Sequence, residues 1–229
     1  ALAASIGTRP AGSVKEKAAA DYIAEQLKTC GYQITYQPFT TTLFTGGDAP
    51  SLNVIATRPG NGQWLVVGGH MDSVAESVGA IDNASGVAAL LETARVLSQM
   101  RPSQTIVVIG FGAEEWGNPS GSEHYVKALE QTDQIGAMLN IDAIGGGRYP
   151  YVHAGATVHH YGPGKNGVSF TGGAIWVREL SLQVAKQLGY EMRTAPEAYW
   201  DGYTGSWSDH YAFVLKDIPV AYFEAWDWH

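Results

Sequence analysis

The fold of this 229-residue chain follows from one stretch, Trp64-Leu65-Val66-Val67-Gly68-Gly69-His70-Met71-Asp72. Its first six residues form a continuous apolar run, which is typical of a strand buried on both faces of a parallel sheet. Its last three residues place a histidine and an aspartate just beyond that strand. In open α/β sheets, ligands bind outside the carboxyl ends of the strands. We therefore expect a functional site at this edge of the sheet.

Strands and helices alternate on both sides of this stretch. Upstream, a capping box at Ser13-Val14-Lys15-Glu16 predicts a helix that ends near Thr29, and alternating residues predict strands at 33–41 and 52–57. The downstream elements that we expect are helix 84–99, strand 105–111, helix 122–130, strand 135–141, a glycine-rich excursion, helix 176–188, a short strand 191–194, helix 207–215 and strand 219–223. This order predicts an α/β fold, a three-layer α/β/α sandwich with a mixed, mostly parallel central sheet.

The composition fits one domain and narrows the class of function. Hydrophobic residues make up 45% and charged residues 16% of the chain, as in a compact globule with a sizeable core. The net charge is -8 and no run of Lys or Arg occurs, which argues against nucleic acid as a partner. No apolar run is long enough for a membrane span. The single cysteine, Cys30, excludes an internal disulfide.

Ligand-type side chains follow several of the predicted strands. The residues concerned are His70 and Asp72, the adjacent Glu114 and Glu115, Asp142, and His229 beyond the last strand. Because the carboxyl ends of parallel strands share one edge, we expect these side chains to converge. Histidine and carboxylates without thiolates suit a hydrolytic zinc site, in which manganese or cobalt can substitute.

Each of these motifs also has a purely structural interpretation. His70 could be a core histidine that is hydrogen-bonded to Asp72, although Asp72 is equally well placed to orient a metal-binding histidine. The stretch Asp82-Asn83-Ala84-Ser85-Gly86 could simply cap a helix. Glu114 and Glu115 could be a solvated surface pair. The hypothesis of a metal site therefore depends on the whole set.

Together these motifs resemble the M28 family of co-catalytic zinc aminopeptidases. The matching segments, in the order of that family, are His70-Met71-Asp72-Ser73, Asp82-Asn83-Ala84-Ser85-Gly86, Phe111-Gly112-Ala113-Glu114-Glu115-Trp116-Gly117, Asn140-Ile141-Asp142 and Ser208-Asp209-His210. The segment from Gly7 to Ser13 is similar to the family's N-terminal segment. The resemblance spans nearly the whole chain.

The resemblance implies a role for each matching residue. It assigns His70 and Asp142 to one zinc ion, Asp82 to both ions as a bridge, and Glu115 with a late histidine to the second ion. The late histidine is His229, with His210 as the alternative. Glu114 matches the general base, and the bond between Asp82 and Asn83 is expected to be a cis peptide. We count Asp72 with Glu114 among the catalytic candidates, as the residue that orients His70.

The resemblance also implies the overall function. We expect residues 1–229 to be a single zinc peptidase catalytic domain that lacks the family's C-terminal loop and helix. The implied activity is zinc-dependent hydrolysis of N-terminal residues from peptides with a free N-terminus. Tyr203 and Trp207 are candidates for substrate binding, and Tyr203 could donate to the oxyanion. We expect a monomer, secreted or periplasmic, although no basic-then-apolar leader precedes Ala1.

Three other functions are compatible with parts of this pattern. A glutaminyl-cyclase-like acyltransferase would use the same fold with one zinc ion. A non-catalytic binding module derived from a peptidase would keep the fold without the activity. A serine hydrolase built on Ser208, Asp209 and His210 is disfavoured, because the sequence has no Gly-x-Ser-x-Gly elbow and three adjacent residues do not easily form a triad.

Overall fold

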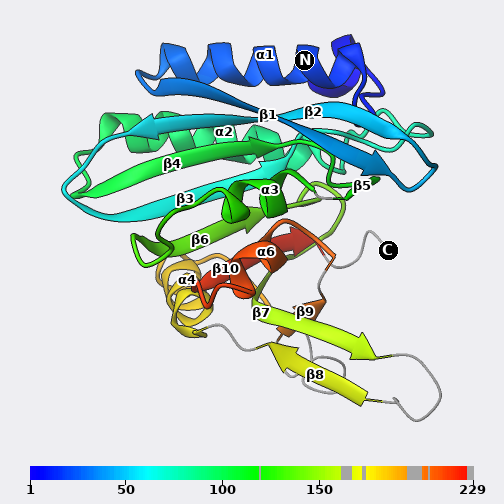
Figure 1. The fold of residues 1–229 in the computed structure, drawn as a ribbon. Helices are drawn as coiled ribbons and strands as arrows, with labels where there is room; N and C mark the ends of the chain where they lie inside the picture. Colours follow the sequence, from blue (N-terminus) through cyan, green and yellow to red (C-terminus); the bar gives the residue numbers. More distant parts are fainter. Residues whose placement is uncertain (119, 161–166, 172–173, 195–202, 206, 226–229) are drawn as a thin grey trace.

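The computed structural model describes residues 1–229 except 119, 161–166, 172–173, 195–202, 206 and 226–229, and for 156–160, 167–171 and 203–205 it describes the backbone alone. Three layers are visible in Figure 1. Helices α1 (Val14–Thr29) and α2 (Ala84–Gln99) pack on one face of a sheet, together with α4 (Trp176–Gln187). The shorter α3 (Gly121–Lys127) and α6 (His210–Val214) cover the other face. The predicted α/β sandwich is confirmed.

Ten strands of the described chain form one continuous sheet. They are β1 (Gln33–Leu43), β2 (Asp48–Arg58), β3 (Gly62–His70), β4 (Gln104–Phe111), β5 (Gly117–Asn118), β6 (Ile135–Ile141), β7 (Pro150–His160), β8 (Gly167–Thr171), β9 (Tyr203–Gly205) and β10 (Val220–Ala225). Their order is β5-β1-β2-β4-β3-β6-β10-β7-β8, with β9 paired to β7. The central strands β4, β3, β6 and β10 are parallel, whereas β2 joins β4 and β7 joins β10 in antiparallel pairs.

The burial of β3 explains its uninterrupted apolar sequence. Val67 packs into the core beneath α1 and α2, whereas its neighbour Val66 packs into the core beneath α3 and α6. Both side chains are completely buried, as are Val108 and Ile109 on the adjacent β4. Successive residues of a strand point to opposite faces, so a strand covered on both sides must be apolar throughout.

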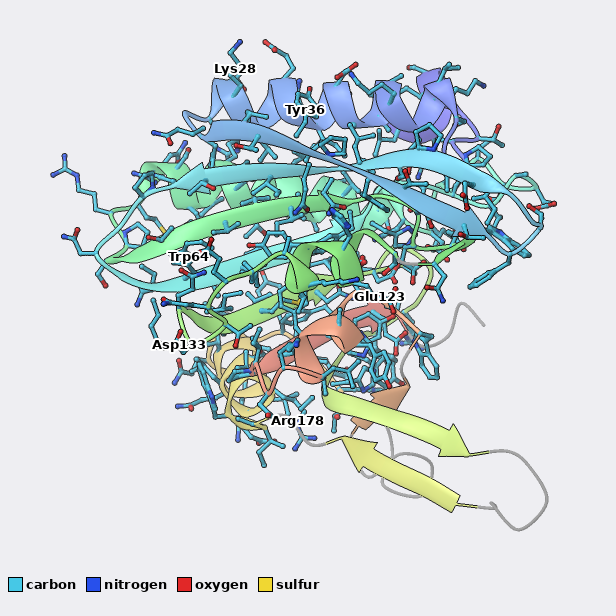
Figure 2. All side chains as sticks on the ribbon, in the orientation of Figure 1. Lys28, Tyr36, Trp64, Glu123, Asp133 and Arg178 are labelled. Atoms are coloured by element: carbon cyan, nitrogen blue, oxygen red, sulfur yellow. The ribbon has the colours of Figure 1, made fainter. Side chains whose placement is uncertain are left out.

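The two ends of the sheet differ in character. Figure 2 shows Trp64 and Asp133 at the end where β3 and β6 begin, and Glu123 of α3 towards the opposite end, where these strands finish. Lys28 projects from the outer face of α1 into solvent. Every helix in the described part of the chain is too short or too polar to cross a bilayer.

The structure corrects several predicted boundaries. The helix expected at 122–130 ends at Lys127, and the helix expected at 207–215 contains only His210–Val214. The strand expected at 191–194 is a single bridge between Arg193 and Tyr151. The glycine-rich excursion after β6 contains the unpredicted strands β7 and β8. Residues before α6 turn towards the end of β6 through hydrogen bonds of Ser208, which explains the late start of that helix.

Candidate metal centre

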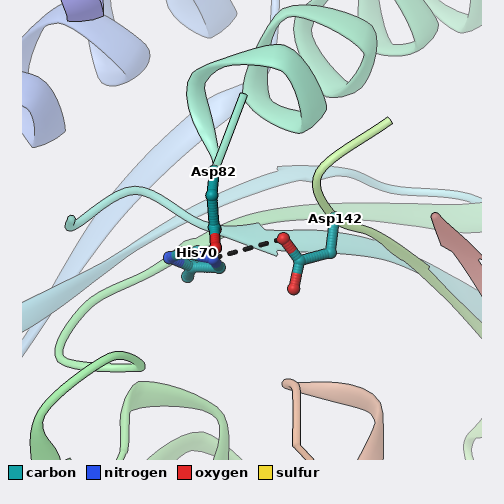
Figure 3. A group of neighbouring side chains, drawn as sticks. All are labelled: His70, Asp82 and Asp142. Atoms are coloured by element: carbon teal, nitrogen blue, oxygen red, sulfur yellow. Dashed lines mark ion pairs between the residues drawn. The ribbon is translucent and has the colours of Figure 1, made fainter. Parts of the chain in front are cut away.

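His70 is the last residue of β3 and lies at the centre of the site. Its side chain is 1% exposed. Its Nε2 atom is 2.9 Å from Oδ1 of Asp82 and 3.3 Å from Oδ1 of Asp142, as Figure 3 shows. The strand beneath must approach β6 closely, because a Cβ atom on Gly69 would lie 2.5 Å from the carbonyl oxygen of Ile141. Glycine at this position lets the two strand ends meet.

Asn83 joins the two loops that carry the aspartates. It caps α2, directly after Asp82, and its Nδ2 atom donates to the carbonyl oxygen of Ile141 at 3.0 Å. Its Oδ1 atom accepts from the backbone N–H of Ala143 at 3.1 Å. Ile141 and Ala143 flank Asp142, so one fully buried amide fixes Asp82 relative to Asp142. The bond between Asp82 and Asn83 is cis, as the resemblance implied.

The three converging side chains fit a divalent cation. One ligand atom from each of His70, Asp82 and Asp142 lies within 4.8 Å of the other two. The Oδ1 atoms of both aspartates are buried, and among the described residues they have no hydrogen-bond partner apart from Nε2 of His70. Buried anionic oxygens without partners are costly unless a cation compensates them. An imidazole nitrogen with carboxylate oxygens is a donor set that suits zinc.

Asp72 connects the ends of β3 and β4. Its Oδ1 atom lies 3.4 Å from Nδ1 of His70, on the side of the ring away from the other aspartates. Its two carboxylate oxygens accept from the backbone N–H groups of Glu114 at 3.1 Å and Glu115 at 3.2 Å. The side chain is fully buried. Asp72 therefore holds the backbone of the two glutamates and lies close to the histidine ring, a position in which second partners of metal ligands commonly act.

Glu114 and Glu115 lie beside the converged group. The Oε2 atom of Glu114 is 3.9 Å from Nε2 of His70. Burial raises the pKa of Glu114 well above its ordinary value, although His70 opposes the shift. Burial also raises the pKa of Glu115 to about 7, again against the influence of His70. Two adjacent carboxylates with perturbed pKa values in a partly enclosed site are candidates for proton transfer or metal binding.

The protonation of His70 depends on its carboxylate neighbours. Burial alone would lower its pKa, but the charges of Asp142 and Glu114 outweigh that effect and raise the pKa well above its ordinary value. The pKa of Asp82 is lowered, because the hydrogen bond and charge of His70 overcome the effect of burial. A metal ion bound by His70 would displace the proton that this raised pKa favours.

A comparison of the sequence with known families identifies the chain. The profile of peptidase family M28 matches residues 53–229, which is more than half of its length. The chain belongs to peptidase family M28. This confirms the resemblance carried by the motifs, and the converged residues all lie within the matched region.

Curated M28 relatives match parts of the chain. Leupeptin-inactivating enzyme 1 of Streptomyces exfoliatus is 38% identical over 145 residues, which cover 61% of this chain and 32% of that protein. An aminopeptidase of Pseudomonas aeruginosa is 47% identical over 97 residues, 41% of this chain and 18% of that protein. This M28 chain therefore spans at most about a third of the length of these relatives.

Solved structures share the fold over nearly the whole chain. The zinc aminopeptidase BSAP of Bacillus subtilis has a TM-score of 0.77 at 20% identity, covering 97% of this chain and 82% of that chain. A zinc-dependent exopeptidase of Parabacteroides distasonis has a TM-score of 0.74 at 22% identity, with coverage of 97% and 80%. A glutaminyl cyclase of Porphyromonas gingivalis reaches 0.69 at 23% identity, with coverage of 95% and 77%. At these identities the likeness shows the fold alone.

Ser208 is part of the M28 site in a way that the sequence analysis missed. Its hydroxyl donates to Oδ2 of Asp142 at 2.7 Å and accepts from Nδ2 of Asn140 at 2.8 Å. The sequence offers Ser208 as part of a family-like segment and as the nucleophile of a disfavoured triad, but not as a partner of Asp142. The ring of His210 instead stacks on Tyr222, with centroids 4.6 Å apart and an interplanar angle of 9°. These contacts place Ser208 on a ligand-type carboxylate and favour a packing role for His210 over a serine triad.

The other residues predicted from the sequence to bind metal or substrate lie in different places relative to the converged group. His229 lies outside the described residues. Within the described chain, the converged ligand group does not include His210, which is fully buried at the start of α6. Tyr203 lies in β9, where only the backbone is described. Trp207 is 45% exposed and lies beside Glu114 at the site.

A cavity opens next to the two glutamates. Its volume is about 370 Å³, and Glu114 and Glu115 form part of its wall. The other residues that line it include Phe44, Asn118, Ser122, Trp207 and Tyr211. Small polar groups and aromatic rings beside a proton-transfer candidate are typical of a substrate site. Phe44 reaches this cavity from the distant hairpin between β1 and β2, and no local pattern in the sequence predicts that it lines the cavity.

Proposed function

We propose that this M28 chain is a zinc-dependent aminopeptidase that hydrolyses N-terminal residues from peptides. The observation that carries the proposal is the convergence of His70, Asp82 and Asp142 at the carboxyl edge of the sheet, where two buried carboxylate oxygens have no partner in the described chain other than His70. Relatives named aminopeptidases support the reaction class. The structure titled a zinc aminopeptidase supports the metal.

The proposed site holds two zinc ions. His70 and Asp142 would bind the first ion, Asp82 would bridge both, and Glu115 with His229 would bind the second. When bound, zinc supplies a Lewis acid and lowers the pKa of a coordinated water towards neutrality. Manganese or cobalt could take its place. His210 remains the alternative to His229, although its stacking on Tyr222 speaks for a role in packing.

Glu114 is the proposed general base. It would take a proton from the attacking water and deliver it to the leaving amine. Support comes from its position 3.9 Å from Nε2 of His70 and from its burial, which raises its pKa and so makes its carboxylate a stronger base. Asp72 would hold Glu114 through its backbone N–H and His70 through its ring, so that the base and the ligand keep a fixed separation.

The proposed substrate is a peptide with a free N-terminal amine. Carboxylates beside the cavity would attract that amine, which favours removal of terminal residues over internal cleavage. Trp207 would form part of the wall that receives a substrate side chain. Tyr203 is proposed as a donor to the oxyanion of the tetrahedral intermediate, a role that resembles other oxyanion donors.

Chelation tests the proposal. A chelator should abolish hydrolysis of aminoacyl-nitroanilides, and added zinc should restore it, whereas the same substrates with an acetylated amine should remain uncut. Two zinc ions per chain and release of free amino acids would support the aminopeptidase. One zinc ion with ring closure of N-terminal glutamine would support the cyclase, and binding without turnover would support a peptide-binding module.

Location outside the cytoplasm remains a proposal. It is supported by one relative, 38% identical over 130 residues, that is named as a probable lipoprotein aminopeptidase of Mycobacterium tuberculosis. Fractionation of the source cells would test it. The expected monomer also remains a prediction, which size-exclusion chromatography of the purified chain would test.

A further inference from the structure

Arg9 is completely buried behind the proposed metal centre. It is the largest fully buried side chain in the described chain. Its guanidinium donates from Nε to the carbonyl oxygen of Met71 at 2.5 Å, from Nη1 to that of Val78 at 2.7 Å, and from Nη2 to that of Gly79 at 3.0 Å. The donors of a planar guanidinium point in fixed directions from three nitrogens and can hold carbonyl groups spread along a loop, whereas the donors of a lysine all leave one nitrogen.

These contacts hold both ends of one loop. Met71 lies between His70 and Asp72, and Gly79 precedes Asp82 by three residues. The backbone of Arg9 adds a further contact, because its N–H donates to the hydroxyl of Ser73 at 3.1 Å. The loop that leads from His70 to Asp82 is therefore fastened to Arg9 from behind.

The loop is shaped to receive the guanidinium. Gly79 has a φ angle of +56°, which favours glycine, and a Cβ atom there would lie 2.8 Å from Nη2 of Arg9. Burial lowers the pKa of Arg9, while the charges of Asp72, Asp82 and Glu115 act in the opposite direction. The partners of the guanidinium are neutral carbonyl groups, so its nearest compensating charges are those of the site itself.

Glu16 holds the second loop of the site. It lies in the first turn of α1 and is 1% exposed. Its Oε1 atom accepts from the backbone N–H of Ala113 at 3.1 Å and from the hydroxyl of Ser51 at 2.7 Å, and its Oε2 atom accepts from Gly12 at 2.7 Å. Ala113 has a φ angle of +54° and directly precedes Glu114.

We propose that Arg9 and Glu16 are positioning residues of the metal centre. Arg9 sets the loop that presents Asp72 and Asp82, and Glu16 sets the turn that presents Glu114 and Glu115. Both residues precede the region 53–229 that matches the family profile, so the profile does not account for them. The inference rests on the proposed function, because it assumes that the site binds metal.

The alternative is a purely structural role, in which Arg9 and Glu16 only anchor the N-terminal segment to the rest of the fold. Arg58 offers a matched comparison, since its guanidinium also donates to two backbone carbonyl oxygens, those of Leu97 at 2.5 Å and Met100 at 2.9 Å. Arg58 pairs with Ile106 at the start of β4, so it lies at the opposite edge of the sheet from the site. Anchoring alone predicts the same consequences at Arg9 and Arg58.

The experiment measures zinc affinity of the full chain by competition with a chromophoric chelator, together with the thermal midpoint of the metal-free protein. Arg9→Lys and Glu16→Gln should weaken zinc binding about 10- to 100-fold, the range for residues that orient metal ligands. Arg58→Lys should stay within about twofold of the wild type. The zinc concentration that gives the half-maximal hydrolysis rate should rise by the same factor in the two site variants.

Three outcomes are decisive. If Arg9→Lys and Glu16→Gln lower the thermal midpoint but bind zinc like the wild type, the positioning role is wrong. If the wild type itself binds no zinc, the proposed function fails, which is a different result. If Arg9→Lys does not fold, Glu16→Gln decides the proposal alone, because it removes one of the two carboxylate acceptors that hold the second loop, and unchanged zinc affinity there would again overturn the positioning role.

Discussion

At the scale of single residues, the two adjacent glutamates Glu114 and Glu115 have different environments and different pKa shifts. Glu114 points towards His70 and is 14% exposed, and burial raises its pKa well above the ordinary value. The pKa of Glu115 is raised to about 7. Asp72 fixes the backbone of both. A general base must be ionised to accept a proton, and nearby cations would lower its pKa into the working range.

Glu114→Gln keeps the size of the side chain and removes its ability to accept a proton. We expect the kcat for aminoacyl-nitroanilides to fall about 10²- to 10⁴-fold, the usual contribution of a general base. The zinc content, measured by atomic emission, should stay that of the wild type. Glu92→Gln, an exposed change on α2, serves as the control and should leave kcat unaffected. A near-normal rate for Glu114→Gln would remove Glu114 from the mechanism.

Ser208→Ala separates an orienting role from a nucleophilic one. The variant loses the hydrogen bond that holds Asp142, so we expect zinc affinity to fall about 10- to 100-fold. At saturating zinc the turnover should recover to within a few-fold of the wild type. A serine nucleophile predicts the opposite result, in which turnover stays abolished whatever the zinc concentration.

At the scale of elements, the sequence predicts what depends on local pattern and misses what depends on distant contacts. The apolar run at 64–69 and the capping box at Ser13 give β3 and α1 with nearly correct limits. The start of α6 is missed, because hydrogen bonds of Ser208 to β6 and Asp142 shape the residues before it. No local pattern encodes such a contact.

Asn83 links the start of α2 to the end of β6 through hydrogen bonds. We expect Asn83→Ala to destabilise the protein by about 1–3 kcal/mol. The variant removes a helix cap and leaves the carbonyl of Ile141 and the N–H of Ala143 buried without their partner. Ser13→Ala at the cap of α1 is the comparison, with an expected loss of about 1 kcal/mol. Urea unfolding measures both. If Asn83→Ala lowers the free energy of unfolding no more than Ser13→Ala does, the hydrogen bonds of Asn83 do not constrain the site.

At the scale of the whole molecule, several buried groups share one pH dependence in the metal-free state. Burial raises the pKa values of Glu16, Glu115 and Asp209 to about 7, and that of Glu114 is also raised. The stability that these neutral acids contribute is complete below their unfolded pKa values and is lost as the pH rises through about 7. The raised pKa of His70 acts in the same direction, since its contribution disappears as the pH rises through the folded value.

We therefore expect the metal-free protein to lose thermal stability between pH 5 and pH 8. The lowered pKa of Asp82 does not oppose this, because its contribution is lost only below the ordinary range of an aspartate. Zinc should raise the thermal midpoint more at pH 8 than at pH 5, since its ligands must be deprotonated. Scanning calorimetry with chelator and with zinc measures both effects, and a midpoint that rises from pH 5 to pH 8 in chelator would contradict the expectation.

The sequence predicts the family and the edge of the sheet that carries the site, because the motifs are short and each follows a strand. The sequence does not reveal how residues 1–52 contribute to the site, because the contacts that they make with it join distant parts of the chain. Arg9 reaches Met71 and Glu16 reaches Ala113 across separations of 62 and 97 residues. The segment from Gly7 to Ser13 resembles the family, but its sequence carries no local signal for the contacts of its arginine.

The most direct test of a two-zinc site is anomalous diffraction at the zinc edge from crystals of the zinc-loaded chain. The account predicts two peaks about 3.5–4 Å apart with Asp82 between them, His70 and Asp142 at one peak and Glu115 at the other. A single peak that Asp82 does not share, or zinc bound away from the carboxyl edge of β3 and β6, would contradict it.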